Sequence, residues 1–315
     1  MTLIRLLNQI IYNNRVPAPD WDWQRGRQMI DDADLVLTEV DADGVATFTL
    51  NRPERRNAWT AAMENRYFDV LAVANTDPAV RVGVLTGAGT SFCPGFDMGR
   101  LDEVAGRGVN ISDRRPQYAP RLFRKPLIAA INGACAGIGL TQALMCDVRF
   151  AARGARFSTA FARRGLGAEY GMSWVLPRYV GVGTALDLLL SSRVFEADEA
   201  RELGLVNRVT EPAEVLAQAR EYARDLARNC SPAAMTVIRH QVLADLDASF
   251  EDACRRSYAV MEVLNSGADF REGVDSFVQK RSPAFGPLPD DLDPEKITGV
   301  LMPGARMALT ELRGG

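Results

Sequence analysis

The sequence predicts an α/β fold in which strand–strand–helix units are stacked one on another. Short apolar runs typical of buried strands recur roughly every forty to fifty residues over the first two thirds of the chain. Two of these runs lead into glycine-bearing turns, at residues 92–97 and 132–139. Beyond residue 211 the apolar residues change to helical spacing. We therefore divide the chain into an N-terminal arm (1–33), a strand–strand–helix core (34–210), a C-terminal helical region (211–286) and a tail (287–315).

The composition is that of an ordinary globular protein. Hydrophobic residues make up 47% of the 315 residues, and the net charge at pH 7 is −3. Such a charge gives no reason to expect nucleic acid or an acidic membrane surface as a partner. No apolar run approaches the roughly 18 residues that a membrane span requires, so we expect no membrane partner.

The cysteines and the histidine argue against a metal site. The five cysteines show no CxxC spacing, and the chain has a single histidine, His240. A Cys/His metal centre needs a denser cluster of ligands than this. Reduced thiols are typical of the cytosol, so we expect a cytoplasmic protein.

The core is expected to begin with a β-hairpin. Apolar runs at 35–40 and 45–50 flank the turn sequence DADG at 41–44, a pattern typical of two antiparallel strands. Thr60 is expected to cap the helix that follows. That helix carries apolar side chains on one face, namely Met63, Tyr67, Val70, Leu71 and Ala74.

Two further strands lead into the glycine turns. Residues 80–85 precede the turn FCPGFD at 92–97, and residues 127–131 precede NGACAGIG at 132–139, which runs toward a helix at 140–146. A glycine-rich turn between a strand and a helix leaves backbone N–H groups open to a ligand. Two such turns can aim two N–H donors at one oxygen, as enzymes do to hold a developing oxyanion.

The spacing of apolar residues also predicts the remaining elements of the core and those of the C-terminal region. A strand is expected at 147–151, and the glycine-bearing turn at 165–171 leads into a helix. After a strand at 206–209, helices are expected at 213–228, 232–246, 250–264 and 269–280. The tail is rich in proline, glycine and aspartate, so we expect a loosely ordered extension.

Familiar nucleotide and hydrolase motifs are incomplete. Gly137 and Gly139 begin a dinucleotide fingerprint, but Gln142 stands where its third glycine belongs. Neither a P-loop nor a Gly-x-Ser-x-Gly elbow occurs. Cys93 and Cys135 lie in the glycine turns without a histidine nearby in the sequence, so neither is expected to act as a nucleophile.

Glu169 is the carboxylate with the most suggestive position. It lies in the turn GLGAEYG at 165–171, just before an apolar helix. A carboxylate there can simply complement the positive end of the helix. A carboxylate among glycines is also well placed to exchange protons with a ligand. The residues alone leave both interpretations open.

Several segments together closely resemble the crotonase superfamily, which is the enoyl-CoA hydratase/isomerase family. They are NRPERRNA at 51–58, SFCPGFD at 91–97, INGACAGIG at 131–139, MCD at 145–147, and the longer stretches 165–181, 197–209 and 270–285. The resemblance runs in order over about residues 35–286. A series of matched segments in order is far more specific than any single one.

The resemblance implies a fold, a substrate and an assembly. The family has the crotonase (ClpP-like) fold, a spiral of ββα repeats followed by a helical region that mediates trimer formation. It binds acyl-CoA thioesters, so coenzyme A arrives as part of the substrate and no permanently bound cofactor is expected. A homotrimer, or a hexamer built as a dimer of trimers, is implied.

The resemblance also implies site residues. The two oxyanion donors would be the backbone N–H groups of Phe96 and Ile138, which also lie against the coenzyme A moiety. Further contacts with coenzyme A would come from Arg55, Arg56, Asp97, Met98 and Gly99. Lys280 matches a family lysine that reaches the phosphate or adenine region of coenzyme A, often on a neighbouring subunit.

The chain departs from the family at the residues that hydrate a double bond. Hydratases of this family use two glutamates, and here Thr141 and Phe161 occupy those positions. Glu169 lies eight residues after the second position. In dienoyl-CoA isomerases and aryl-CoA dehalogenases a catalytic aspartate stands there. We therefore expect Glu169 to act as the acid/base.

Three functions are consistent with this pattern. A single carboxylate suits migration of an enoyl-CoA double bond, because one base can remove a proton and return it elsewhere. Hydration by Glu169 and an ordered water, with help from Thr141, is the alternative within the enzyme class. A non-catalytic acyl-CoA-binding member is the alternative outside it. Four aromatic side chains either line an acyl pocket or pack in the core: Phe157, Phe161, Tyr170 and Trp174.

Overall fold

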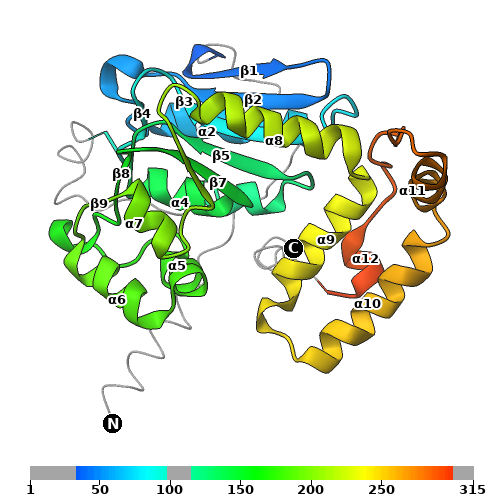
Figure 1. Ribbon diagram of the computed structural model, residues 1–315. Helices are drawn as coiled ribbons and strands as arrows, with labels where there is room; N and C mark the ends of the chain where they lie inside the picture. Colours follow the sequence, from blue (N-terminus) through cyan, green and yellow to red (C-terminus); the bar gives the residue numbers. More distant parts are fainter. Residues whose placement is uncertain (1–32, 98–114, 301–315) are drawn as a thin grey trace, which may run out of the picture.

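The computed structural model describes residues 33–97 and 115–300. Met98 and Gly99, the arm up to residue 32 and the end of the tail lie outside the described residues. Within the described ranges, the chain forms two sheets and a set of helices (Figure 1). Four helices, α9 to α12, extend from one end of the sheets.

The larger sheet has six strands in the order β1-β2-β3-β5-β7-β10. Their bounds are Val36–Val40 (β1), Val45–Leu50 (β2), Val82–Gly87 (β3), Leu127–Ile131 (β5), Val148–Ala152 (β7) and Arg208–Thr210 (β10). The first two strands form the predicted antiparallel hairpin, and all other neighbours are parallel. Two parallel strands must be joined by a long crossover connection. Here each such connection contains a helix, strands of the second sheet, or both.

The smaller sheet has four strands in the order β4-β6-β8-β9. Their bounds are Ser91–Cys93 (β4), Ala134–Ala136 (β6), Arg156–Ser158 (β8) and Phe195–Glu196 (β9). The strands β4, β6 and β8 follow β3, β5 and β7 in the chain, which confirms the strand–strand–helix repeat. β4 and β6 were expected to be parts of the glycine turns, and this was wrong. A three-residue strand is too short to show an alternating pattern.

Helices cover the sheets. They are α2 (Ala61–Thr76), α4 (Ile138–Met145), α5 (Met172–Val180), α6 (Val182–Ser191), α7 (Ala197–Glu202) and α8 (Val215–Asn229). Short 3-10 helices lie at Ala33–Leu35 (η2), Pro53–Arg55 (η3), Ala119–Leu122 (η4), Ala162–Arg164 (η5) and Asp245–Asp247 (η6). Thr60 caps α2 as predicted, because its side chain accepts from the N–H of Met63.

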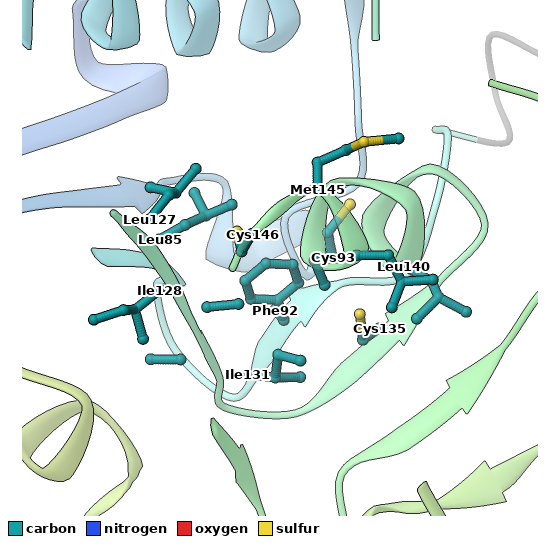
Figure 2. Close-up of a cluster of buried hydrophobic side chains, with 14 of the residues drawn as sticks. Leu85, Phe92, Cys93, Leu127, Ile128, Ile131, Cys135, Leu140, Met145 and Cys146 are labelled. Atoms are coloured by element: carbon teal, nitrogen blue, oxygen red, sulfur yellow. The ribbon is translucent and has the colours of Figure 1, made fainter. Parts of the chain in front are cut away.

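The core between the two sheets fixes the position of α4. Figure 2 shows Phe92 of β4, Cys135 of β6 and Leu140 of α4 in one cluster with Ile131 of β5. All of these side chains are buried. The small cysteine side chains let the strands and the helix approach closely, so the packing of the core sets the geometry of the glycine turns.

The C-terminal helices α9 (Pro232–Ala244), α10 (Phe250–Leu264) and α11 (Ala268–Gln279) have the expected positions. The tail was expected to be loosely ordered, and this was wrong for its first part. Residues 294–298 form helix α12 (Pro294–Thr298), which packs on α9 and α10. Asp293 caps this helix and Pro294 occupies its first turn, two signals that start a helix.

His240 joins α9 to this last helix. Its Nε2 lies 2.9 Å from the hydroxyl oxygen of Thr298, and both residues are buried. Burial lowers the pKa of His240 below its usual value of 6.5, and the nearby carboxylate of Glu295 opposes the shift only in part. The folded chain therefore favours neutral His240.

We expect the free energy of unfolding to fall as the pH decreases below about 6.5, because the unfolded chain then binds a proton that the folded chain resists. Above that pH His240 is neutral in both states and contributes no pH dependence. The test is urea unfolding at pH 7.0 and 5.5 for wild type and His240→Asn. Since His240 is the only histidine, the variant should show a smaller fall, and equal falls would contradict the account.

Candidate active site

The two glycine turns meet at the ends of neighbouring strands. β4 and β6 pair in parallel, with Cys93 opposite Cys135, so both strands deliver the chain to the same edge. A Cβ atom built on Gly95 would lie 3.4 Å from the carbonyl oxygen of Ala136, and one on Gly137 would lie 3.8 Å from the Cα of Gly95. The backbones of the two turns therefore lie side by side.

Phe96 lies three residues beyond the end of β4 and forms an isolated parallel bridge with Trp59. We call residues 91–97, which comprise β4 and this extension, the donor strand. The N–H of Trp59 donates to the carbonyl of Gly95 at 2.8 Å, and the N–H of Asp97 donates to the carbonyl of Trp59 at 3.1 Å. Successive backbone groups of an extended chain point to opposite sides. The N–H of Phe96 consequently faces away from Trp59.

Ile138 is the first residue of α4. Gly137 precedes it with φ 52° and ψ −122°, and the N–H of Gly137 donates to the carbonyl of Ser158 at 3.1 Å. The first N–H groups of a helix have no acceptor within the helix and lie at the positive end of its dipole. The geometry of the N–H of Ile138 is thus set by the helix start and by β8.

Close backbone packing joins α4 to β4. A Cβ atom on Gly139 would lie 2.2 Å from the carbonyl oxygen of Cys93, so only glycine allows this approach. The contact links the helix that begins at Ile138 to the strand that leads to Phe96. Both candidate donors are therefore held by one rigid unit.

The loop with the predicted phosphate contacts is attached to the same strand. Asn57 is buried, and its Nδ2 donates to the carbonyls of Ser91 and Ala88 at 2.7 and 2.9 Å. Arg55 and Arg56 lie on this loop with exposed side chains, and Arg56 has φ 54°. The exposed guanidinium groups could pair with phosphate.

Asp97 takes part in an ion pair beside Phe96. The guanidinium of Arg52 lies 3.2 Å from the carboxylate of Asp97 and also donates to the carbonyl of Ala58 at 2.7 Å. Asp97 was expected to contact coenzyme A, but its ion pair with Arg52 was not predicted from the sequence. The Arg52 pair ties the residue after Phe96 to the segment that precedes α2.

The loop with Glu169 packs against the donor strand. The ring of Tyr170 contacts the ring of Phe96, with centroids 6.4 Å apart and an interplanar angle of 55°. Tyr170 has φ 53°, which is rare for a residue with a side chain, and Gly171 then caps α5 with φ 75°. Glu169 is half-buried, and its carbonyl accepts from the N–H of Met172 at 3.0 Å.

Lys280 lies far from the turns of its own chain. It ends α11 with φ 53°, and its side chain is exposed. Figure 1 shows α11 at the opposite end of the molecule from β4 and α4. The structure therefore brings together Phe96, Ile138 and the Glu169 loop, but it does not bring Lys280 of the same chain to them.

The sequence of the chain matches the profile of the enoyl-CoA hydratase/isomerase family over residues 41–287. The chain belongs to this family. Among solved structures, an enoyl-CoA hydratase from Mycobacterium marinum is 50% identical, with a TM-score of 0.59, over 67% of this chain and 98% of that one. A probable enoyl-CoA hydratase/isomerase from Mycobacterium abscessus is 32% identical, with a TM-score of 0.75, over 80% of this chain and 98% of that one.

One relative is named an isomerase and not a hydratase. The 1,2-epoxyphenylacetyl-CoA isomerase of Escherichia coli (strain K12) is 34% identical over 262 residues, which cover 80% of this chain and 98% of that protein. The relatives of this chain thus include proteins named hydratase and a protein named isomerase. The chain is an acyl-CoA enzyme of the hydratase or isomerase type.

The two positions where family hydratases carry glutamates lack acid/base groups here. Thr141 is fully buried in α4, and its hydroxyl donates to the carbonyl of Gly137 at 3.2 Å. Phe161 is buried beside η5. The hydroxyl of Thr141 already donates to the backbone, and the side chain of Phe161 has no exchangeable proton. Neither residue can therefore exchange protons with a substrate at neutral pH.

Two of the aromatic candidates have packing roles. Phe157 is buried and stacks on Phe195 with centroids 5.6 Å apart. The ring of Trp174 lies under the guanidinium of Arg178, 3.7 Å from its centroid. Among the ring pairs of the described residues, Tyr170 is the one aromatic candidate that packs on a predicted donor residue, Phe96.

Burial argues against Cys93 and Cys135, the two cysteines of the glycine turns, as nucleophiles. Burial raises the pKa of the Cys93 thiol to about 12 and also raises the pKa of Cys135 well above its usual value. Both of these thiols therefore favour the protonated form at neutral pH. In the described ranges no group of His, Cys, Asp and Glu side chains could hold a metal ion, and no helix is long and apolar enough to cross a membrane.

A separate cavity lies away from the turns. It has a volume of about 420 Å³ and is lined by residues from η4, α9 and the segment before α12, including His240 and Arg239. Arg239 also pairs with Asp147 at 2.8 Å. None of the predicted site residues lines this cavity, and His240 has a structural role here.

We expect Gly139→Ala to destabilise the protein by about 3 kcal/mol, because the new methyl group would collide with the backbone carbonyl of Cys93. Gly183→Ala is the matched control, since no atom lies within 4 Å of its Cβ position. Chemical denaturation of both variants measures the difference. A stable Gly139→Ala protein with unchanged activity would show that the approach of α4 to β4 is not tight.

Proposed function

We propose that this protein shifts the double bond of an enoyl-CoA thioester, with Glu169 as the acid/base and the N–H groups of Phe96 and Ile138 as the oxyanion hole. The ring contact between Tyr170 and Phe96 carries the proposal, because it brings the Glu169 loop onto the donor strand. Membership of the hydratase/isomerase family supports the acyl-CoA substrate.

The reaction needs one base and one anion site. The Glu169 carboxylate removes a proton from the carbon next to the thioester of a 3-enoyl-CoA. The electron pair moves toward the thioester oxygen and forms a dienolate, which two fixed donors stabilise, each typically by ~3 kcal/mol. The protonated Glu169 then returns the proton to the γ carbon, which yields the 2-enoyl-CoA and regenerates the base.

Thr141 and Phe161, at the two positions where family hydratases carry glutamates, favour isomerisation over ordinary hydration. Adding water requires a group to activate the water and a group to protonate the α carbon. Thr141 and Phe161 supply neither, since the hydroxyl of Thr141 already donates to the backbone. Migration of a double bond needs only one proton carrier.

Hydration by Glu169 and an ordered water is the second candidate. The 50% identical structure from Mycobacterium marinum is named an enoyl-CoA hydratase, and this name favours the alternative. Both candidates use the same oxyanion hole. They differ in whether Glu169 acts on a carbon-bound proton or on water.

Contacts with coenzyme A are proposed for the exposed residues of the site. Arg55 and Arg56 lie on the loop that Asn57 attaches to β4, so their guanidinium groups can reach phosphate near the hole. Asp97 directly follows Phe96, and we propose that it contacts the same ligand. Met98 and Gly99 lie outside the described residues and stay a proposal from the resemblance alone. We assign Lys280 to the site of a neighbouring subunit, because α11 lies far from its own β4.

A trimer is proposed as the assembly. The C-terminal helices expose many apolar side chains, and Phe277 is 85% exposed. A second apolar stripe lies on α6 at Val182, Leu186 and Leu190. Exposed apolar surface of this extent marks an interface between proteins. Trimers, or pairs of trimers, would bury it.

Glu169→Gln is expected to lower kcat at least about 100-fold with little change in KM, because the amide cannot accept the substrate proton. Steady-state assays with 3-enoyl-CoA and 2-enoyl-CoA substrates measure the effect. Glu202→Gln, at an exposed position on α7, is the control and should behave as wild type.

The same assays separate the candidate functions. Turnover of 3-enoyl-CoA to 2-enoyl-CoA supports the proposal, whereas turnover of 2-enoyl-CoA to the hydroxyacyl product supports hydration. Unchanged turnover in Glu169→Gln would remove Glu169 from the mechanism. Binding of acyl-CoA without turnover by the wild type would indicate a non-catalytic member.

The solution mass is expected to be a multiple of three chains, measured by light scattering. Phe277→Asp should lower this mass, because it places a charge in the proposed interface. Val73→Asp, on α2, changes an exposed apolar residue outside that surface and should keep the assembly. A monomeric or dimeric wild type would refute the trimer.

A further inference from the structure

A buried carboxylate lies behind the donor strand. Glu64, in the first turn of α2, is only 2% exposed. Its Oε2 accepts a hydrogen bond from the indole Nε1 of Trp59 at 3.0 Å. The Trp59 side chain is itself buried and packs edge-on against Tyr67 with centroids 5.9 Å apart.

The partner of Glu64 is the residue that holds Phe96. Trp59 bonds through its backbone to Gly95 on one side of Phe96 and to Asp97 on the other, at 2.8 and 3.1 Å. The indole of Trp59 is fixed at one end by Glu64 and along its edge by the core. The orientation of the Trp59 backbone is consequently coupled to the Glu64 carboxylate.

A buried carboxylate needs a physical reason. Removing a charge from water costs free energy, and well-packed apolar residues stabilise a core as well as a buried charge does. An apolar side chain at position 64 would serve packing alone. It would leave the indole N–H without this acceptor, which is one of the two contacts that orient the ring.

We propose that Glu64 is a positioning residue for the reaction, which acts through Trp59 to hold the Phe96 N–H at the angle that an enolate oxygen requires. The inference rests on the proposed oxyanion hole. Glu64 does not touch the substrate in this account. Its role is to keep the donor strand rigid, because a displacement of about 1 Å in a catalytic group can cost 100-fold in rate.

The experiment combines kinetics with an optical readout of the hole. The variants are Glu64→Leu, which removes the acceptor, Trp59→Phe, which removes the donor and keeps an aromatic ring, and the double variant. Steady-state assays give kcat and KM. The absorbance of bound cinnamoyl-CoA gives the polarisation of the thioester carbonyl, because a polarised conjugated thioester absorbs at longer wavelength.

Each single variant is expected to lower kcat about tenfold, to change KM less than about twofold and to reduce the red shift of bound cinnamoyl-CoA. The double variant should lose no more than either single variant, since both act through one hydrogen bond. Glu64→Gln keeps an acceptor oxygen and should recover most of the rate. Glu202→Gln removes a carboxylate from an exposed position on α7 and is the control.

The outcomes separate positioning from stability and from the function itself. Additive losses in the double variant, or a full red shift in Glu64→Leu, would overturn the positioning role. A loss of rate in Glu202→Gln equal to that in Glu64→Leu would also overturn it. A wild type that neither turns over substrate nor shifts the absorbance would refute the oxyanion hole, and the positioning role with it.

Discussion

The geometry of the candidate site depends on one steric constraint, the contact between α4 and β4. At Gly139 the helix backbone lies against the carbonyl of Cys93, where any Cβ atom would collide. Ile138 begins the same helix, and Phe96 follows the same strand. The distance between the two proposed donors is therefore fixed by backbone packing, and the apolar cluster around Phe92 keeps that packing rigid (Figure 2).

Much of this arrangement could be predicted from local sequence signals. The turn at 41–44 predicts its hairpin because aspartate and glycine favour the turn geometry, and Thr60 caps α2 as expected. β4 and β6 could not be found by periodicity because each has three residues. The contact of Tyr170 with Phe96 and the Trp59–Glu64 bond depend on how distant segments fold together, so no local pattern reports them.

Two layers of the site have separate tasks in the proposed mechanism. The backbone donors stabilise a negative oxygen, a requirement shared by hydration, isomerisation and other enolate reactions. The side chains around them decide which proton moves. Here the hydroxyl of Thr141 is bonded to the carbonyl of Gly137, and Phe161 is apolar. Glu169 is then the carboxylate on which the proposed chemistry rests, and Tyr170 holds its loop against the donor strand.

The most direct test of the account is a crystal structure of the protein with a non-reactive acyl-CoA analogue. The account predicts that the thioester oxygen lies about 3 Å from the backbone nitrogen atoms of both Phe96 and Ile138. It also predicts that the Glu169 carboxylate faces the carbon atoms next to the thioester. A thioester oxygen bound away from these two N–H groups would contradict the oxyanion hole and the mechanism built on it.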